Sequence, residues 1–227
     1  MMGKLFVIEG LDGSGKTTQL NLLDKNIKKM GYSTRQIKLP NYEDPSSELV
    51  KMYLQGRFGT RPQDVNIFAA SSFFAVDRYV SYNCYWKEDY SQGKLILADR
   101  YTTSNAYHQM IKVPKNSWND YLEWLEDYEY NKLGIPRPDT VIYLDVPVEV
   151  SQNLLTERYK GDEIKKDIHE KNVSYLLECR QAALFACEKL KWHRIDCVQG
   201  QGIKTIQAIA QEVFSIILKE LNIDAGI

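Results

Sequence analysis

A glycine-rich segment near the N-terminus carries the clearest chemical signal in this sequence. It reads EGLDGSGKTTQ over residues 9–19 and follows the apolar run LFVI. Gly10, Gly15, Lys16 and Thr17 match the phosphate-loop pattern, in which four residues separate two glycines and lysine and threonine follow. Small residues let backbone N–H groups close around phosphate oxygens, and the helix that follows adds its positive N-terminal dipole. The segment therefore predicts a site for a nucleoside triphosphate.

Side chains within this loop have distinct expected roles. Lys16 is expected to reach the β and γ phosphates, and the Thr17 hydroxyl to bind Mg²⁺. Asp12 must turn away from bound phosphates, toward a hydroxyl of a second ligand, unless it serves only to shape the turn. We expect the triphosphate to contact the whole loop, which comprises Gly10, Leu11, Asp12, Gly13, Ser14, Gly15, Lys16, Thr17 and Thr18.

A second polar group follows the apolar run LILA at 95–98. Asp99 and Arg100 come directly after it, at the expected carboxyl end of a buried strand, where open α/β sheets bind ligands. Asp99 is suited to hold Mg²⁺ directly or through water, and the Arg100 guanidinium is suited to a phosphate. A structural ion pair between the two is the alternative, and the phosphate loop makes it the weaker one. The next residues, TTSN at 102–105, suit a helix start and hydrogen bonding.

Phe74 and Arg78 lie four residues apart and share one face of a predicted helix. The ring can stack on a nucleobase while the guanidinium donates to the edge of the same base. A phenylalanine at helical spacing is more often part of the core. An arginine on an apolar face needs a partner, however, which modestly favours a ligand.

The elements that would position these groups alternate between strands and helices. Predicted strands cover residues 4–9, 34–39, 94–98, 140–145 and 193–198, and predicted helices cover 16–30, 46–55, 66–86, 103–110, 118–131, 148–158, 168–189 and 203–221. This alternation indicates a parallel sheet of about five strands flanked by helices, the α/β three-layer sandwich of P-loop nucleotide-binding proteins. We expect one domain over residues 1–227. The charged segment YKGDEIKK at 159–166 is either a mobile loop or a solvated surface.

Composition argues against several classes of protein. The formal net charge of −1 gives no basis for binding nucleic acid. No apolar stretch approaches the ~18 residues of a membrane span, and the first apolar run is too short for a signal peptide. Four cysteines form no CxxC pair and only three histidines occur, so we expect neither a zinc site nor disulfides, and a cytoplasmic location.

Several segments together resemble those of thymidylate kinases, within the nucleoside monophosphate kinase group. They are EGLDGSGKTTQ, LPNY, FFAVDR, ADRYTTSNAYHQ, PRPDTVIYLDV, and DIHE before LECR, and they span residues 5–180. The resemblance implies phosphoryl transfer from ATP, with Mg²⁺, to dTMP, and a homodimer as in much of the family. A kinase for another nucleotide or deoxynucleoside is the alternative. A nucleotide-binding switch is a weaker one, because the sequence has no NKxD-like motif for reading a base.

The same resemblance implies an acceptor site. Asp12 would face the sugar hydroxyl, Phe74 would stack on thymine, Arg78 and Asn105 would bond its edge, and Arg100 would hold the acceptor phosphate. Further positions implied at the site are Tyr42 near that phosphate, Ser104 in the polar run beside the substrate, His108 near the sugar 2′ position, Asp99 at the magnesium, and the acidic pair Asp167 and Glu170.

Two positions depart from the family pattern. Asn41 follows Pro40 where related sequences often carry arginine, so we expect the phosphate to depend more on Arg100 and Tyr42. Counting from Asp99 places His108 where the family tends to have an aromatic residue, which leaves selection of deoxyribose less secure than selection of the base.

The phosphate loop contains no arginine, since Gly13 and Ser14 occupy the inner positions. Members of the family then supply a cation from a lid, which we expect at about 157–171. Arg158 is the favoured candidate, because its fork suits charge spread over phosphoryl oxygens. Lys160, Lys165 and Lys166 are the alternatives, unless they only make the surface soluble. Lys16, Arg100, Asp99 and Arg158 are thus the expected catalytic residues.

Overall fold

The computed structural model describes residues 2–158, 160, 169–170, 172–200 and 202–223. Five strands form one sheet in the order β2-β3-β1-β4-β5, and each neighbouring pair is parallel. The strands are β1 Leu5–Glu9, β2 Thr34–Lys38, β3 Leu95–Asp99, β4 Thr140–Asp145 and β5 His193–Asp196. The predicted parallel α/β sheet is confirmed.

Burial explains the order of the strands. Every residue of β1, β3 and β4 is buried, as expected for strands covered on both faces of a parallel sheet. The strands β2 and β5 each bury only one residue and lie at the two edges. The three most apolar strands therefore form the centre of the sheet.

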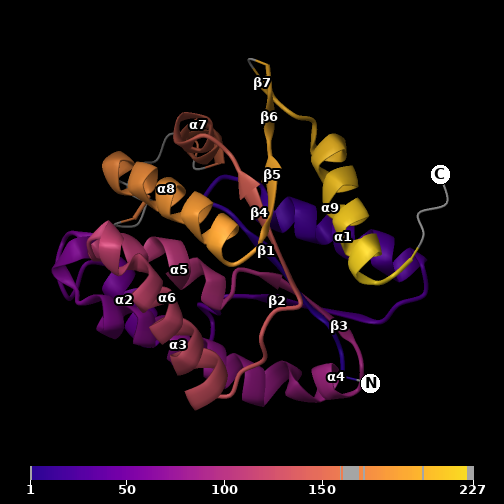
Figure 1. Cartoon of the computed structure of the whole chain (residues 1–227), viewed down its shortest axis with the longest axis horizontal. Helices are drawn as coiled ribbons and strands as arrows, with labels where there is room; N and C mark the ends of the chain where they lie inside the picture. The colour runs from indigo at the N-terminus through magenta and orange to yellow at the C-terminus, as the bar shows by residue number, and fades with distance from the viewer. Residues whose placement is uncertain (1, 159, 161–168, 171, 201, 224–227) are drawn as a thin grey trace.

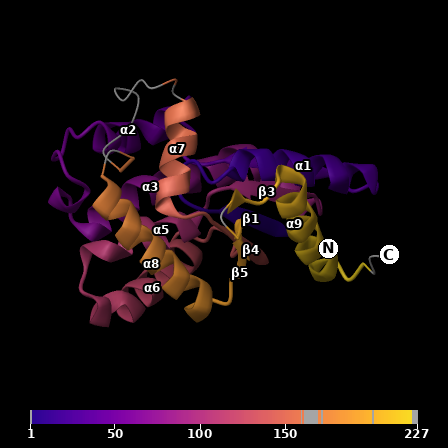
Figure 2. The same cartoon turned by 90° about the horizontal axis from the view of Figure 1, so that it is seen from above.

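Helices cover both faces of this sheet. Figures 1 and 2 show α1 and α9 on one side of it, and α3, α5, α6 and α8 on the other. Two separate apolar clusters correspond to this division, one joining α1 and α9 to the strands and one joining α5, α6 and α8. The helices are α1 Lys16–Lys29, α2 Glu48–Leu54, α3 Ile67–Ser81, α4 Lys87–Ser91, α5 Asn105–His108, α6 Trp118–Glu126, α7 Val148–Arg158, α8 Val173–Lys189 and α9 Ile206–Glu220.

Several helix boundaries differ from those expected. The helices predicted over 66–86 and 118–131 each end in a π-helical segment, Tyr82–Trp86 and Asp127–Lys132. The helix predicted from 168 begins at Val173, because the side chain of Asn172 accepts a hydrogen bond from the backbone of Tyr175 and caps it there.

A short hairpin replaces the expected start of the last helix. Residues Val198–Gln199 (β6) pair antiparallel with Gly202–Ile203 (β7). The helix expected from residue 203 therefore starts at Ile206, where the Thr205 hydroxyl accepts from the backbone N–H of Ala208. In the described part of the chain, no helix is both long enough and apolar enough to cross a membrane.

The sheet brings the two polar segments of the sequence together at the carboxyl ends of its strands. The strands β1 and β3 are neighbours, and Ile8 is in register with Asp99. Because parallel strands end together, the phosphate loop after β1 and the Asp99–Arg100 pair after β3 lie side by side.

Candidate active site

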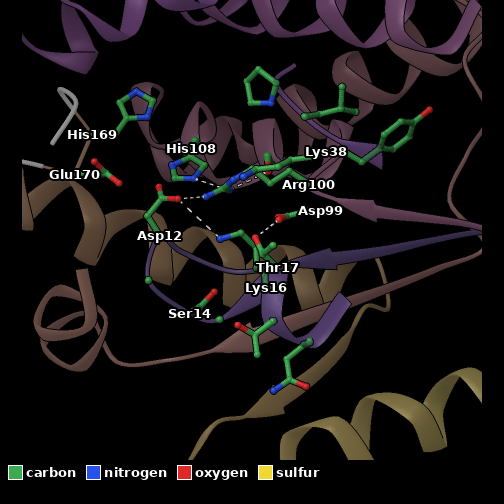
Figure 3. A pocket seen from close by; sticks show the side chains of 18 of the residues that line it. Asp12, Ser14, Lys16, Thr17, Lys38, Asp99, Arg100, His108, His169 and Glu170 are labelled. Carbon is green, nitrogen blue, oxygen red and sulfur yellow. Dashed lines mark hydrogen bonds and ion pairs between the residues drawn. The ribbon is translucent and has the colours of Figure 1, made fainter. Parts of the chain in front are cut away.

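A cavity of about 840 Å³ lies at the carboxyl ends of β1 and β3 (Figure 3). It brings together most of the predicted site residues, and its lining includes Asp12, Gly13, Ser14, Gly15, Lys16, Thr17, Thr18, Tyr42, Phe74, Arg78, Asp99, Arg100, Ser104, Asn105, His108 and Glu170. Gly10 and Leu11 are not among the lining residues. Their carbonyl oxygens instead accept hydrogen bonds from the Lys16 ammonium, at 3.0 and 2.9 Å.

The phosphate loop needs glycine where it packs most closely. Gly13 has φ of 82°, and a Cβ there would lie 2.4 Å from the carbonyl oxygen of Ser151. A side chain at this position would displace the loop from α7. Glycine at position 13 thus allows the loop to lie close to α7.

Lys16 is a buried cation at the centre of the cavity. Its ammonium lies 3.9 Å from Asp12 Oδ1, and only 7% of its side chain is exposed. Burial, with help from Arg100, lowers the pKa of Lys16 to about 8, while Asp12 and Asp99 act in the opposite direction. The lysine is therefore charged at neutral pH and close enough to its pKa to titrate under mildly alkaline conditions.

Thr17 and Asp99 provide oxygen ligands suited to magnesium. The Thr17 hydroxyl donates to Asp99 Oδ2 at 2.5 Å, and the carboxylate is 3% exposed. The described residues contain no cluster of three His, Cys, Asp or Glu side chains that could hold a metal. Mg²⁺ in nucleotide sites is held by one or two protein oxygens together with water and substrate phosphate, and Thr17 and Asp99 offer such oxygens.

Arg100 is another cation of the cavity, close to Lys16. It has φ of 71°, in the left-handed region, and its Nη2 donates to Asp12 Oδ1 at 2.5 Å. Its Nη1 donates to the Tyr107 hydroxyl at 3.0 Å and to Ser104 Oγ at 3.2 Å. Burial alone would raise the pKa of Asp12, but Arg100 and Lys16 outweigh it and hold that pKa below its usual range.

Glu9 is a buried carboxylate next to Arg100 that the sequence did not mark as a site residue. None of its side chain is exposed, and its Oε2 lies 3.9 Å from Arg100 Nη1. Four donors converge on its two oxygens: the Thr103 hydroxyl at 2.6 Å, the Ser104 and Tyr107 hydroxyls at 2.8 Å each, and the Tyr101 N–H at 3.1 Å. The polar run after Asp99 is thus tied to the end of β1.

Phe74 and Arg78 both line the cavity from α3. The Phe74 ring is half-buried and meets Tyr53 edge-on at 6.1 Å. Arg78 is 3% exposed and forms a bidentate ion pair with Glu129, at 2.6 and 2.5 Å. The argument that this arginine lacks a partner without a ligand is therefore wrong, because the protein itself supplies a carboxylate.

The segment after β2 is held by Asp77, a carboxylate of α3. Asp77 accepts from the Asn41 N–H at 3.2 Å and from the Ser46 hydroxyl at 3.0 Å, and the Leu39–Pro40 peptide is cis. Burial raises the pKa of Asp77. This arrangement places Tyr42, which is 47% exposed, at the rim of the cavity.

His108 is a buried, neutral ring beside Arg100. Its Nε2 lies 3.4 Å from Arg100 Nη1, and it stacks on His169 with the centroids 5.4 Å apart. Burial, Arg100 and His169 together lower the pKa of His108 well below its ordinary value. Burial, together with Lys112, lowers that of His169 to about 3.

The expected lid is described only in part. Arg158 ends α7, but its side chain, together with residues 159, 161–168 and 171, lies outside what the structure describes, so Lys165, Lys166 and Asp167 have no described position. Lys160 is exposed. Glu170, the other member of the predicted acidic pair, is buried and lines the cavity (Figure 3).

Comparison with known proteins gives a consistent result. A family model described as thymidylate kinase matches residues 8–208. The chain belongs to the thymidylate kinase family. The thymidylate kinase of Mycobacterium tuberculosis (strain H37Rv) is 26% identical to it over 185 residues, which cover 80% of this chain and 84% of that protein. The probable thymidylate kinase of Thermococcus gammatolerans is 30% identical over 225 residues, or 97% and 98% of the two chains.

A solved structure shares the fold of this thymidylate kinase family member. The thymidylate kinase of Candida albicans superposes with a TM-score of 0.69, covering 97% of this chain and 93% of that one, at 23% identity. The family and fold expected from the sequence motifs are therefore confirmed. The carboxylates Glu9, Asp77 and Glu129, which support the site, were missed. For Glu9 and Asp77 the only signal in the sequence is an acid within a largely apolar segment, which must find partners when buried, whereas Glu129 lies in the polar run EDYEYNK and has no such signal.

Proposed function

We propose that this chain transfers the γ-phosphoryl group of ATP to dTMP, giving ADP and dTDP. An oxygen of the dTMP phosphate attacks the γ-phosphorus while the bond to the β–γ bridging oxygen breaks. The observation that carries the proposal is the position of Lys16 and Arg100, which follow neighbouring parallel strands and line one cavity. Two phosphate-binding cations so placed suit a donor and an acceptor phosphate facing each other.

The donor side is the phosphate loop. Its N–H groups and Lys16 would hold the β and γ phosphates, and Thr17 and Asp99 would hold Mg²⁺ with its waters. The metal, when bound, neutralises charge that develops on the phosphate oxygens. Beyond the loop the cavity is lined by Ile203 and Ile206, which offer an apolar surface for the adenine.

The acceptor side is built by α3 and the residues after β3. Arg100 would bind the dTMP phosphate, with Tyr42 at the rim, and Phe74 would lie against the base. Asp12, Ser104 and His108 surround Arg100 and line the space between the base and the phosphate, where the sugar would lie. Because the acceptor is already an anion, catalysis depends on alignment and charge stabilisation rather than on a strong base.

The lid and its cation are part of this proposal. A lid at about 157–171, with Arg158 as the favoured cation, would exclude water and stabilise the transferred phosphoryl group. Two observations support it: the phosphate loop has no arginine of its own, and α7 packs against the loop where Ser151 approaches Gly13.

A homodimer and a cytoplasmic location belong to the same proposal. The outer face of α3 exposes Phe68, Val76 and Tyr79 at 46%, 42% and 44%, an apolar surface suited to a second copy. All four cysteines are free thiols, as expected in a reducing compartment. Light scattering of the wild type and of Val76→Glu tests the dimer, since a charge on this face should yield monomers.

A coupled assay for ADP with a panel of nucleotides tests the activity. We expect ATP and Mg²⁺ to support rapid turnover with dTMP, slower turnover with dUMP, and little with dCMP, dGMP or deoxynucleosides. A faster reaction with another acceptor would reassign the substrate. ATP hydrolysis that no acceptor stimulates would instead favour a nucleotide-binding switch.

A further inference from the structure

Glu129 is a fully buried carboxylate behind the base-binding side of the cavity. It lies in the π-helical segment Asp127–Lys132, has no exposed surface, and does not line the cavity itself. Its two oxygens accept hydrogen bonds from three side chains: Arg78, Thr102 and Asn105. Two of these, Arg78 and Asn105, do line the cavity.

The ion pair determines which nitrogen of Arg78 can reach a ligand. Nε donates to Glu129 Oε2 at 2.6 Å and Nη2 to Oε1 at 2.5 Å. This bidentate contact uses one side of the planar guanidinium and fixes its plane. Nη1 makes no hydrogen bond to any described residue, so it is the donor left for the cavity.

Glu129 also determines the orientation of the Asn105 amide. Its Nδ2 donates to Glu129 Oε1 at 3.3 Å and to the Ser71 carbonyl oxygen at 3.2 Å. Both partners can only accept, so a flipped amide would place oxygen against oxygen. The amide oxygen of Asn105 is therefore the atom left for a ligand.

The cavity thus presents a donor from Arg78 and an acceptor from Asn105. Thymine offers the complementary pair on one edge, the O4 acceptor and the N3–H donor. Cytosine has the reverse pattern there, an N4 amino donor and an N3 acceptor. In the same position, dCMP would place its N4 amino donor against the Arg78 donor and its N3 acceptor against the Asn105 amide oxygen.

We propose that Glu129 is a positioning residue that sets the base selectivity of the acceptor site, by holding Arg78 and Asn105 in a donor–acceptor pattern that matches thymine or uracil and opposes cytosine. This inference rests on the proposed function, because it assumes that the cavity takes a pyrimidine monophosphate. Glu129 does not contact the substrate itself and acts on it through Arg78 and Asn105.

Glu129→Gln tests the proposal at nearly unchanged volume. The new amide can donate to Asn105 Oδ1, so the variant removes one of the two acceptors that oppose a flipped amide, while the Ser71 carbonyl oxygen remains. We expect the ratio of kcat/KM for dTMP to that for dCMP to fall roughly tenfold or more, mainly through KM for dTMP, since hydrogen-bonding sites reject mispaired analogues strongly. The ratio for dTMP to dUMP should stay unchanged, because these two bases share the edge that Glu129 controls.

Ratios measured on one preparation do not depend on the fraction of folded enzyme, which separates positioning from stability. Asp145→Asn is the matched control. Asp145 is 1% exposed and accepts from Arg180 and Arg194, which are 31% and 45% exposed, so Asp145→Asn likewise neutralises a buried carboxylate paired with arginine, but away from the cavity lining. We expect it to lower the thermal midpoint and leave the dTMP to dCMP ratio as in the wild type.

Thr102→Val provides a milder variant should Glu129→Gln fail to fold. It removes one donor, at 2.8 Å, that orients the Glu129 carboxylate, and should shift the same ratio in the same direction by a few fold. Unchanged dTMP to dCMP ratios in the folded variants, or an equal fall in the dTMP to dUMP ratio, would overturn the proposal.

Calorimetric titration of dTMP and dCMP separates this inference from the proposed function. If the wild type binds dTMP over dCMP without transferring phosphate, the proposed reaction fails, and the binding ratio of Glu129→Gln still decides the role of Glu129. If the wild type is an active kinase and the variant keeps the wild-type preference, the inference alone fails.

Discussion

Replacing Glu9 by glutamine should lower the stability of the protein and raise KM for dTMP. The carboxylate is wholly buried and accepts from four donors, three of them hydroxyls. Glutamine retains one carbonyl oxygen and turns the other position into a donor. If the amide nitrogen takes the Oε1 position, Thr103 and the Tyr101 N–H lose their acceptor. If it takes the Oε2 position, Ser104 and Tyr107 lose their 2.8 Å contacts and keep only Glu9 Oε1 at 3.0 Å and the Gly10 carbonyl oxygen at 3.1 Å.

The size of the effect follows from these contacts. A hydrogen bond to a charged group contributes about 1.5–3 kcal/mol, and hydroxyls that lose an acceptor recover part of it by rotating. We therefore expect the free energy of unfolding of Glu9→Gln to fall by about 2–4 kcal/mol. For a chain of this size, that corresponds to a decrease in Tm of about 4–16 °C.

The same change should act on the acceptor through Arg100. Its Nη1 donates to Ser104 and Tyr107, and Glu9 orients both hydroxyls. We expect KM for dTMP to rise about tenfold, equivalent to about 1.4 kcal/mol, with KM for ATP little changed.

Circular dichroism melts and the coupled ADP assay measure these two effects. Glu123→Gln, which neutralises an exposed carboxylate on α6, is the control and should change stability by no more than about 0.5 kcal/mol. If Glu9→Gln melts within about 2 °C of the wild type with an unchanged KM for dTMP, the hydrogen bonds to Glu9 do not position Arg100 and the reasoning fails.

Three further predictions concern the nucleotide site. The kcat/KM for ATP should fall above pH 8, because Lys16, with a pKa of about 8, is charged below that pH and neutral above it; Lys16→Arg, which cannot lose its proton there, should lack this alkaline fall. Thr17→Val should raise the Mg²⁺ concentration for half-maximal activity by about tenfold or more, while Thr17→Ser keeps it near the wild type; equal Mg²⁺ requirements would rule out a Thr17 ligand. Arg78→Ala should raise KM for dTMP about 10- to 100-fold and lower stability by about 3–5 kcal/mol, because Glu129 stays buried without its partner; equal losses for ATP and dTMP would exclude a role in reading the base.

Much of the fold could be predicted because its strongest determinants are local. The central strands are continuous apolar runs, and the glycine loop with its lysine has the strand before it and the helix after it that the phosphate-loop pattern requires. The start of α8 could not be predicted as well. The helix was expected from residue 168, and its observed start at Val173 depends on a hydrogen bond from the Tyr175 N–H to the Asn172 side chain. The hairpin of Val198–Gln199 and Gly202–Ile203 was missed because two-residue strands have almost no periodicity.

The candidate site divides in the same way. Residues with a motif around them, such as Lys16 and Arg100, were predicted and line the cavity. Glu9 and Glu129 were not, because their importance comes from partners distant in sequence. Glu129 bonds Arg78 across 51 residues and Glu9 bonds Tyr107 across 98, and no local spacing records such a contact.

The register between β1 and β3 has a consequence for how this family diverges. Ile8 lies beside Asp99 on adjacent strands, which run about 4.8 Å apart in any sheet. The main-chain ladder, rather than any individual side chain, therefore sets the distance between the ends of β1 and β3, after which the phosphate loop and Arg100 follow. We therefore expect relatives at 26–30% identity to keep this distance as long as they keep the pairing of these two strands.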